Sequence, residues 1–285
     1  MSALLLTVDE LRALHRILGT WLPRFVVEDH DESLRVDAAA LRGLAARGLL
    51  TLAPDWTVVD GLTLDDAVTG HLEPYRTARL VVEAEAETAG VTTRFAVSAA
   101  PDGTVGLLTA LPGGLVSTEL IDSPALDVVA RMCRLDQVAA AGGPAGPELA
   151  CRVDVDAHFE ADGLALAGDL DGAVAALVCG GAPEPAARAW ISALVSRRGA
   201  AAISVAHVAG TTPTVPEGPI ADGELRWLVA DDGTAWRVTV NESSQPRSDR
   251  LVSVLTPTSV DELGRTMAGL FTPARAGGGA SCQTS

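Results

Sequence analysis

Residues 224–241, ELRWLVADDGTAWRVTVN, hold two alternating runs of apolar residues on either side of a short Asp-Asp-Gly-Thr corner. Alternation with a period of two is typical of β-strands, and an Asp-Gly pair between two such runs predicts a β-hairpin. If Asp232 and Gly233 form a two-residue type I′ turn, Val229 lies opposite Trp236 and one face of the hairpin is wholly apolar. We therefore expect the core-facing side to consist of Leu225, Trp227, Val229, Trp236, Val238 and Val240.

The length of the hairpin loop decides which residues share a face. A three-residue loop would shift the register by one residue, place Trp227 opposite Arg237 and mix apolar and polar residues on both faces. Because such a slip exchanges core for solvent, the two-residue loop is favoured. The second face then is either a solvated sheet surface or a docking surface, and it holds Arg226, Leu228, Arg237 and Thr239.

The rest of the chain switches between helical and strand periodicity. The first segment, residues 7–18, is predicted to be a helix with Thr7 and Glu10 as a capping box. The stretch ARLVVEAEAET alternates small or apolar residues with acidic ones, which predicts a half-buried strand that opens a three-strand meander. Further helices are expected over 37–47, from Thr63 to Pro74, and over 124–135, 170–178, 184–198 and 259–271, with extended segments at 153–155, 200–208 and 250–256.

The two halves of the sequence share one plan, in which helices precede an antiparallel meander with an Asp-Gly corner and a closing helix. Residues 103–120 and 249–267 are expected to occupy corresponding places in the two halves. The fold class is therefore predicted to be α+β, a pseudo-twofold domain with a central antiparallel sheet. The expected boundaries are 1–138 for the first half, 139–148 for a Gly/Pro/Ala linker, 149–272 for the second half, and 273–285 for a disordered tail.

The charge of the chain narrows the classes of partner. The formal net charge of −16 argues against binding to nucleic acid or to an anionic membrane, since both would require a basic surface. The N-terminal residues have no positively charged segment, and no window approaches 18 apolar residues. The protein is therefore expected to be cytoplasmic.

A search for catalytic or metal-binding motifs finds no nucleophile elbow, P-loop, dinucleotide fingerprint or zinc spacing. The acidic stretch DVDAHFEAD, residues 154–162, lacks the glycine and the later glutamate of a calcium loop, so helix caps and solvated acids explain it. Cys133, Cys151 and Cys179 are expected to be buried or half-buried apolar residues. We expect no enzyme activity, no catalytic residue, no metal and no cofactor.

Several segments resemble the EspG family, the secretion-associated proteins of actinobacterial type VII (ESX) systems. The segment LTVDELRALHRILG is similar to the opening of that family, and AALRGLAARGLL is similar to a helix that ends in an Arg-Gly-Leu turn. The order of elements from VDVDAHFEAD to the helix SVDELGRTMAGLF also follows the family, so the resemblance covers residues 4–272.

The resemblance implies a cytosolic chaperone or adaptor that binds the apolar tip of PE–PPE heterodimers or WXG-type helical substrates, keeps them soluble and targets them for export. It implies a partner surface formed by the second face of the hairpin and the end of the last helix: Arg226, Leu228, Arg237, Thr239, Leu270 and Phe271. The alternatives are a non-catalytic interaction module or oligomeric scaffold of the same fold, such as a homodimer, and an enzyme with an unrecognised site.

Overall fold

The first repeat of the chain is built from an edge strand, a group of helices, four further strands of the same sheet and a closing helix. In the computed structural model its elements are β1 (Leu4–Thr7), α1 (Val8–Leu18), α2 (Arg24–Val27), α3 (Leu34–Ala46), β2 (Leu50–Leu52), β3 (Leu62–Leu64), α4 (Asp66–Arg76), β4 (Leu80–Thr88), β5 (Val91–Ala99), β6 (Val105–Leu111), β7 (Leu115–Ile121) and α5 (Ala125–Met132). The structure describes residues 3–27, 34–53, 62–135, 146–208, 223–242 and 251–272.

The second repeat follows the same order. Its elements are a short 3₁₀ turn (Pro147–Leu149), β8 (Cys151–Asp154), α7 (Val155–Leu166), α8 (Leu170–Cys179), α9 (Glu184–Val195), β9 (Arg197–His207), β10 (Gly223–Ala230), β11 (Ala235–Glu242), β12 (Leu251–Thr258) and α10 (Val260–Leu270). The expected tail, 273–285, and the expected linker up to residue 145 lie outside the described residues.

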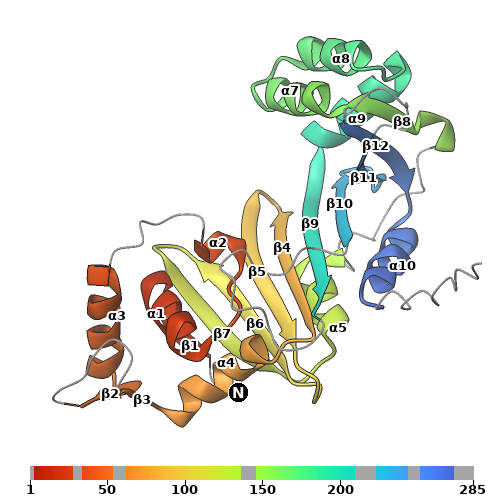
Figure 1. The fold of residues 1–285 in the computed structure, drawn as a ribbon. Coiled ribbons are helices and arrows are strands. Elements are labelled where there is room, and N and C mark those ends of the chain that lie inside the picture. The colour runs from red at the N-terminus through yellow and green to blue at the C-terminus, as the bar shows by residue number, and fades with distance from the viewer. Residues whose placement is uncertain are drawn as a thin grey trace, which may run out of the picture.

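One ten-stranded antiparallel sheet contains both repeats, in the order β1-β7-β6-β5-β4-β9-β10-β11-β12-β8 (Figure 1). This order reads the same from either edge once β4 is equated with β9, β5 with β10, β6 with β11, β7 with β12 and β1 with β8. The strand registers place the local twofold axis at the pair Ala84 and Ile203, which occupy equivalent positions of β4 and β9. The predicted pseudo-twofold α+β fold is confirmed.

Helices cover the two faces of the sheet differently. On one face, α5 and α10 pack on a continuous central core that includes Val82 and Phe95 of the first repeat and Trp227 of the second. On the opposite face, α1, α2, α3 and α4 enclose a first-repeat core, and α7, α8 and α9 enclose a separate second-repeat core. Figure 1 shows these two helical units at opposite ends of the sheet, with the middle strands running between them. No helix among the described residues is long and apolar enough to cross a membrane.

The predicted register of the β10–β11 hairpin is wrong. The structure pairs Leu228 with Trp236 and Trp227 with Arg237, which is the register of a three-residue loop. Ala230 N donates to Thr234 O at 2.9 Å, and Gly233 N donates to Ala230 O at 2.9 Å. Gly233 has a φ of 83°, which suits the left-handed residue of a type I turn with a G1 bulge.

The β5–β6 hairpin of the first repeat uses the same loop. Ala100 N donates to Thr104 O at 2.9 Å, and Gly103 adopts a φ of 88°. Asp102 Oδ1 accepts a hydrogen bond from Thr104 N at 2.9 Å, as Asp232 Oδ1 accepts one from Thr234 N at 2.8 Å. The true internal correspondence is therefore between these two loops, and the predicted match of 103–120 with 249–267 is wrong, because the former is β6–β7 and the latter is β12–α10.

With this register, the residues expected on one apolar face lie on two different faces of the sheet. Leu225, Trp227 and Val229 lie in the central core, whereas Trp236 and Val238 point to the opposite face and lie in the second-repeat core. Val240 is 40% exposed. From Trp227 to Ala230, next to the loop, β10 is buried on both faces, so the assumption of one solvated face does not hold there.

Most helices begin where the sequence predicts. The capping box at the start of α1 is present: Glu10 N donates to Thr7 Oγ1 and Thr7 N donates to Glu10 Oε2. Helix α4 continues through Pro74 to Arg76, and α3 begins at Leu34, earlier than predicted. Helix α7 was missed, because the stretch 154–162 was interpreted as a cap with solvated acids.

Helix α7 is fixed to the sheet by a buried polar network. A hydrogen bond of 2.9 Å joins His158 Nδ1 of α7 to Ser253 Oγ of β12. His158 Nε2 lies 3.5 Å from Asp162 Oδ2, and Trp190 Nε1 of α9 donates to Asp162 Oδ1 at 3.2 Å. Burial lowers the pKa of His158 and raises the pKa of Asp162, because a charge is disfavoured away from water.

The hairpin loop gives a first prediction. Gly233→Ala should lower the free energy of unfolding by about 1 kcal/mol or more, because an L-residue is strained at this positive φ. The matched control is Gly163→Ala in the interior of α7, where an added Cβ would meet no atom within 4 Å and alanine is the better helix former. Urea unfolding of both variants measures the difference. Equal stability of the two variants would contradict the assigned loop.

The network under α7 gives a second prediction. Since the pKa of His158 is lowered in the folded state, the unfolded chain binds the proton more readily, and stability falls as the pH drops below about 6.5. The raised pKa of Asp162 has the opposite effect on stability, because it favours proton binding by the folded state as the pH falls. The Asp162 carboxyl group is present in both the wild type and the variant. Between pH 7.5 and 5.5, His158→Gln should therefore lose less unfolding free energy than the wild type. Parallel stability curves for the two proteins would contradict the assignment.

Candidate functional site

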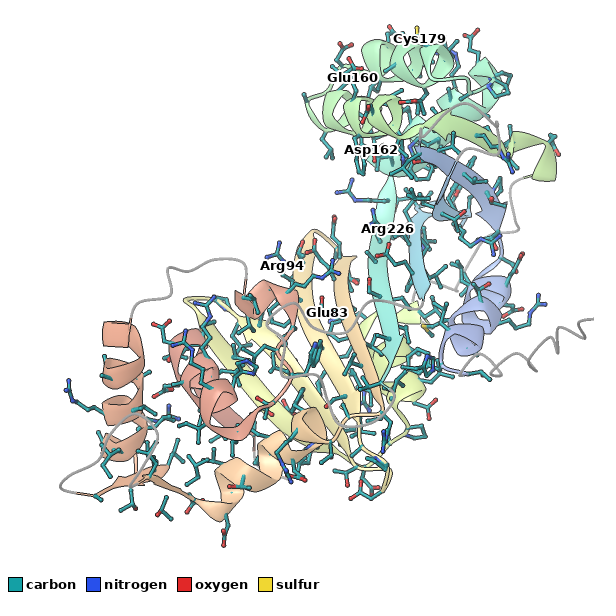
Figure 2. All side chains as sticks on the ribbon, viewed as in Figure 1. Glu83, Arg94, Glu160, Asp162, Cys179 and Arg226 are labelled. Atoms are coloured by element: carbon teal, nitrogen blue, oxygen red, sulfur yellow. The ribbon has the colours of Figure 1, made fainter. Side chains whose placement is uncertain are left out.

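A polar groove crosses the middle of the sheet. It lies on the face that carries the two helical units, between α1–α4 and α7–α9. Its cavity volume is about 220 Å³, and its floor is the outward face of β4 and β9 around the local twofold axis. Figure 2 shows Glu83, Arg94 and Arg226 along this central region. The polar residues that line the groove are Arg24, Glu83, Glu85, Arg94, Ser204, Glu224 and Arg226.

The charges in this polar groove balance one another. Arg94 Nε donates to Glu85 Oε2 at 2.8 Å, and Arg24 N donates to Glu83 Oε1 at 2.9 Å. The pair formed by Arg226 Nη2 and Glu224 Oε2 is longer, at 3.5 Å, and both side chains are close to half exposed. Exposed pairs of this kind contribute little stability, so Arg226 is weakly held where it stands.

An apolar pocket of about 260 Å³ adjoins the groove in the second repeat, between α7, α9 and strands β9 to β12, with the ion pair of Arg197 and Glu87 of β4 at its edge. Three of its residues are large and exposed: Phe159 and Leu166 of α7, at 56% and 65%, and Val240 of β11. The deeper wall is formed by buried residues, among them Trp190 and Leu228. Arg226 lines both the pocket and the groove, so it marks their shared boundary.

The floor of the apolar pocket carries the network of Ser253, His158 and Asp162. These residue types also occur in hydrolytic triads, in which an exposed serine hydroxyl attacks the substrate. Here Ser253 is completely buried within β12, and its hydroxyl is bonded to His158. The arrangement therefore positions α7 and does not present a nucleophile to the pocket. Among the described residues, no cluster of three His, Cys, Asp or Glu side chains could hold a metal ion.

The three cysteines that the structure describes do not line either cavity. Cys133 and Cys151 are buried, as predicted, and burial raises the pKa of the Cys133 thiol to about 12. Cys179, at the end of α8, is exposed, so the expectation that it is buried or half-buried is wrong (Figure 2). Its position follows from the geometry of α8, whose inward face is formed by Ala173, Val174 and Leu177.

The residues predicted to form one partner surface are divided between the two faces of the sheet. Arg226 and Leu228 line the apolar pocket. Arg237 lies on the opposite face, where Nη1 donates to Thr266 Oγ1 of α10 at 3.5 Å. The four hairpin residues do not share a face, because the register differs by one residue from the prediction. Thr239 is half-buried on the face of Arg237, and Leu270 and Phe271 pack against the central core.

Sequence reasoning missed the residues of α7 that border the pocket. Phe159 and Leu166 are seven positions apart, which places them on one side of a helix. That spacing was present in the sequence, but it carries no signal until 155–166 is recognised as a helix. The N-cap of this helix, Asp154, accepts a hydrogen bond from Asp156 N at 3.0 Å.

The strand registers relate the two repeats residue by residue. Thr7 and Asp154 correspond, because each ends an edge strand and caps the helix that follows. The shared hairpin loops fix the remaining strands in the same way. Equivalent pairs are Leu11 with His158, Arg12 with Phe159, Ala96 with Arg226, Leu108 with Val238, and Val116 with Ser253.

The first repeat fills the space that corresponds to the apolar pocket with its own chain. Residues 19–33 join α1 to α3, whereas residues 167–169 alone join α7 to α8. Within the longer connection, Trp21, Leu22 and Val26 are buried in the first-repeat core together with Leu11, Ala96, Leu108 and Val116. The equivalent positions of the second repeat line an open pocket.

Comparison with known proteins supports this description of the fold. No protein-family model matches the sequence, and no curated protein matches it. Among solved structures, that of the Mycobacterium tuberculosis type VII secretion system chaperone EspG5 in complex with a PE25–PPE41 dimer is similar over 94% of this chain and 95% of that chain. The TM-score is 0.54 and the sequence identity is 12%. The chain therefore has the fold of EspG5, as the resemblance in sequence pattern predicted.

Proposed function

We propose that this protein is a cytoplasmic chaperone or adaptor of a type VII secretion system, which binds the apolar tip of a helical PE–PPE-type substrate. The support is twofold: the chain has the fold of EspG5, which was solved in complex with a PE25–PPE41 dimer, and it has an open apolar pocket. A chaperone of this kind requires a surface that shields apolar residues of its client from water.

The observation that carries the proposal is the exposure of Phe159, Leu166 and Val240 around the mouth of one pocket. Isolated exposed apolar residues are common, but a group that surrounds a cavity is typical of an interaction site. Covering such side chains contributes about 25 cal/mol per Å² of apolar surface removed from water.

The polar groove beside the pocket supplies the surroundings that an interface needs. Interfaces commonly have an apolar centre within a polar, solvated rim. Three charged residues of the groove, which meets the pocket at Arg226, have this character: Glu83, Glu85 and Arg94. We infer that the client's apolar tip enters the pocket and that its polar flanks lie over the groove.

The proposed function is tested by co-expressing the protein with candidate PE–PPE pairs from the same genome and applying the mixture to size-exclusion chromatography. Co-elution with one pair, with increased solubility of that pair, supports the proposal. If no candidate pair co-elutes, the proposal fails. A homodimer that dissociates when the pocket residues are changed would instead favour the scaffold alternative.

Substitutions at the pocket mouth give a third prediction. Leu166→Gln and Phe159→Ser should each weaken binding of the PE–PPE pair about 10-fold to 100-fold, which corresponds to losing the burial of one large apolar side chain. Because both side chains are exposed in the free protein, the melting temperature should change little. Isothermal titration calorimetry measures the affinity.

The matched control for these variants is Val178→Gln. Val178 is an exposed apolar residue of α8 and does not line the pocket. Its substitution should leave the affinity within about twofold of the wild type. A loss of affinity in this control equal to that of Leu166→Gln would show that general surface hydrophobicity, and not the pocket, holds the client.

A further inference from the structure

We infer that the apolar pocket receives the C-terminal end of a helical turn, and that Arg226 binds the free main-chain carbonyl groups at that end. This inference rests on the proposed function and specifies which part of the partner enters the pocket and in which direction. It is drawn from the internal repeat, because the first repeat contains the same space in an occupied state.

The occupied space in the first repeat shows how its contents are held. Helix α2, Arg24–Val27, inserts Val26 into the first-repeat core, where it is fully buried. Arg12 Nε donates to Val26 O at 2.8 Å, and Arg12 Nη2 donates to Val27 O at 2.8 Å. A guanidinium group therefore binds two carbonyl groups at the C-terminal end of the inserted turn.

The second repeat supplies its guanidinium group from a different place. Phe159 stands at the position of Arg12, so α7 offers an apolar side chain and no donor there. Arg226 stands at the position of Ala96, on the sheet floor beside the pocket. A turn placed in the pocket as α2 is placed in the first repeat would cover Arg226, as Ala96 is covered completely.

Covering Arg226 limits what the occupant can be. A buried guanidinium group without acceptors is strongly unfavourable, and the contact with Glu224 is long, at 3.5 Å. Asp162 also lines the pocket, but its Oδ1 already accepts from Trp190 Nε1 and its Oδ2 lies 3.5 Å from His158 Nε2. The last carbonyl groups of a helix have no partner within the helix, and they carry the negative end of its dipole. They are the acceptors that the equivalent turn already presents to Arg12.

The test compares Arg226→Ala with the wild type in titrations against the PE–PPE pair that co-elutes with the protein. Alanine occupies the equivalent position 96, so the strand accommodates this side chain. The affinity should fall about 10-fold to 100-fold, as expected for loss of a hydrogen-bonded charge at a buried site. Arg188→Ala is the matched control, because Arg188 is an exposed, ion-paired arginine of α9 that lines neither cavity.

Two results would overturn the inference while leaving the proposed function in place. One is that the wild-type protein binds the PE–PPE pair and that Arg226→Ala binds it with the same or higher affinity. The other comes from a double-mutant cycle with acidic residues of the partner's tip changed by Asp→Asn or Glu→Gln. If one such change costs as much affinity as Arg226→Ala and the two losses are fully coupled, the acceptor is a carboxylate. Independence of Arg226 from every acidic residue of the tip supports the carbonyl contact. Failure of wild-type protein to bind any pair would instead overturn the proposed function itself.

Discussion

The antiparallel pairing of β4 with β9 is the interaction on which the rest of the structure depends. It joins the two repeats into one sheet around the pair Ala84 and Ile203. Because the axis is perpendicular to the sheet, α5 and α10 fall on the same face and close a common core. The same axis places the two helical units at opposite ends of the other face, and the polar groove lies between them.

The two repeats differ in the connection that follows their first helix. Both repeats build a space between the helix after the edge strand and the meander of the sheet. The first repeat closes this space with the segment after α1, which inserts Trp21 and Val26. The second repeat has the turn 167–169 at that place, so Phe159 and Leu166 remain exposed at the mouth of a pocket. In the described part of this nearly symmetric fold, the second repeat thus has an open apolar pocket where the first repeat is filled.

Local signals in the sequence predicted most helices and the strands of the meander, but they missed α7 and could not fix the register of the β10–β11 hairpin. The capping box of Thr7 and Glu10 and the positions of the strands depend on neighbouring residues. An Asp-Gly corner suits both a type I′ turn and a type I turn with a G1 bulge, since each needs a residue with positive φ. The choice between them assumed one solvated face, yet Trp227 and Trp236 are buried on opposite faces. Placing the site therefore required knowledge of what covers each face.

The floor of the pocket differs in polarity from the equivalent surface of the first repeat. In the first repeat the floor positions are Leu11 and Val116, which are buried by the inserted turn. In the second repeat the same positions hold His158 and Ser253, which bond to each other. The floor of the second repeat is therefore more polar than that of the first, although His158 Nε2 has no hydrogen-bond partner and lies 3.5 Å from Asp162 Oδ2. The acidic stretch that gave no functional signal in the sequence, residues 154–162, thus supplies the N-cap of α7 and part of the polar floor of the pocket that we propose as the partner site.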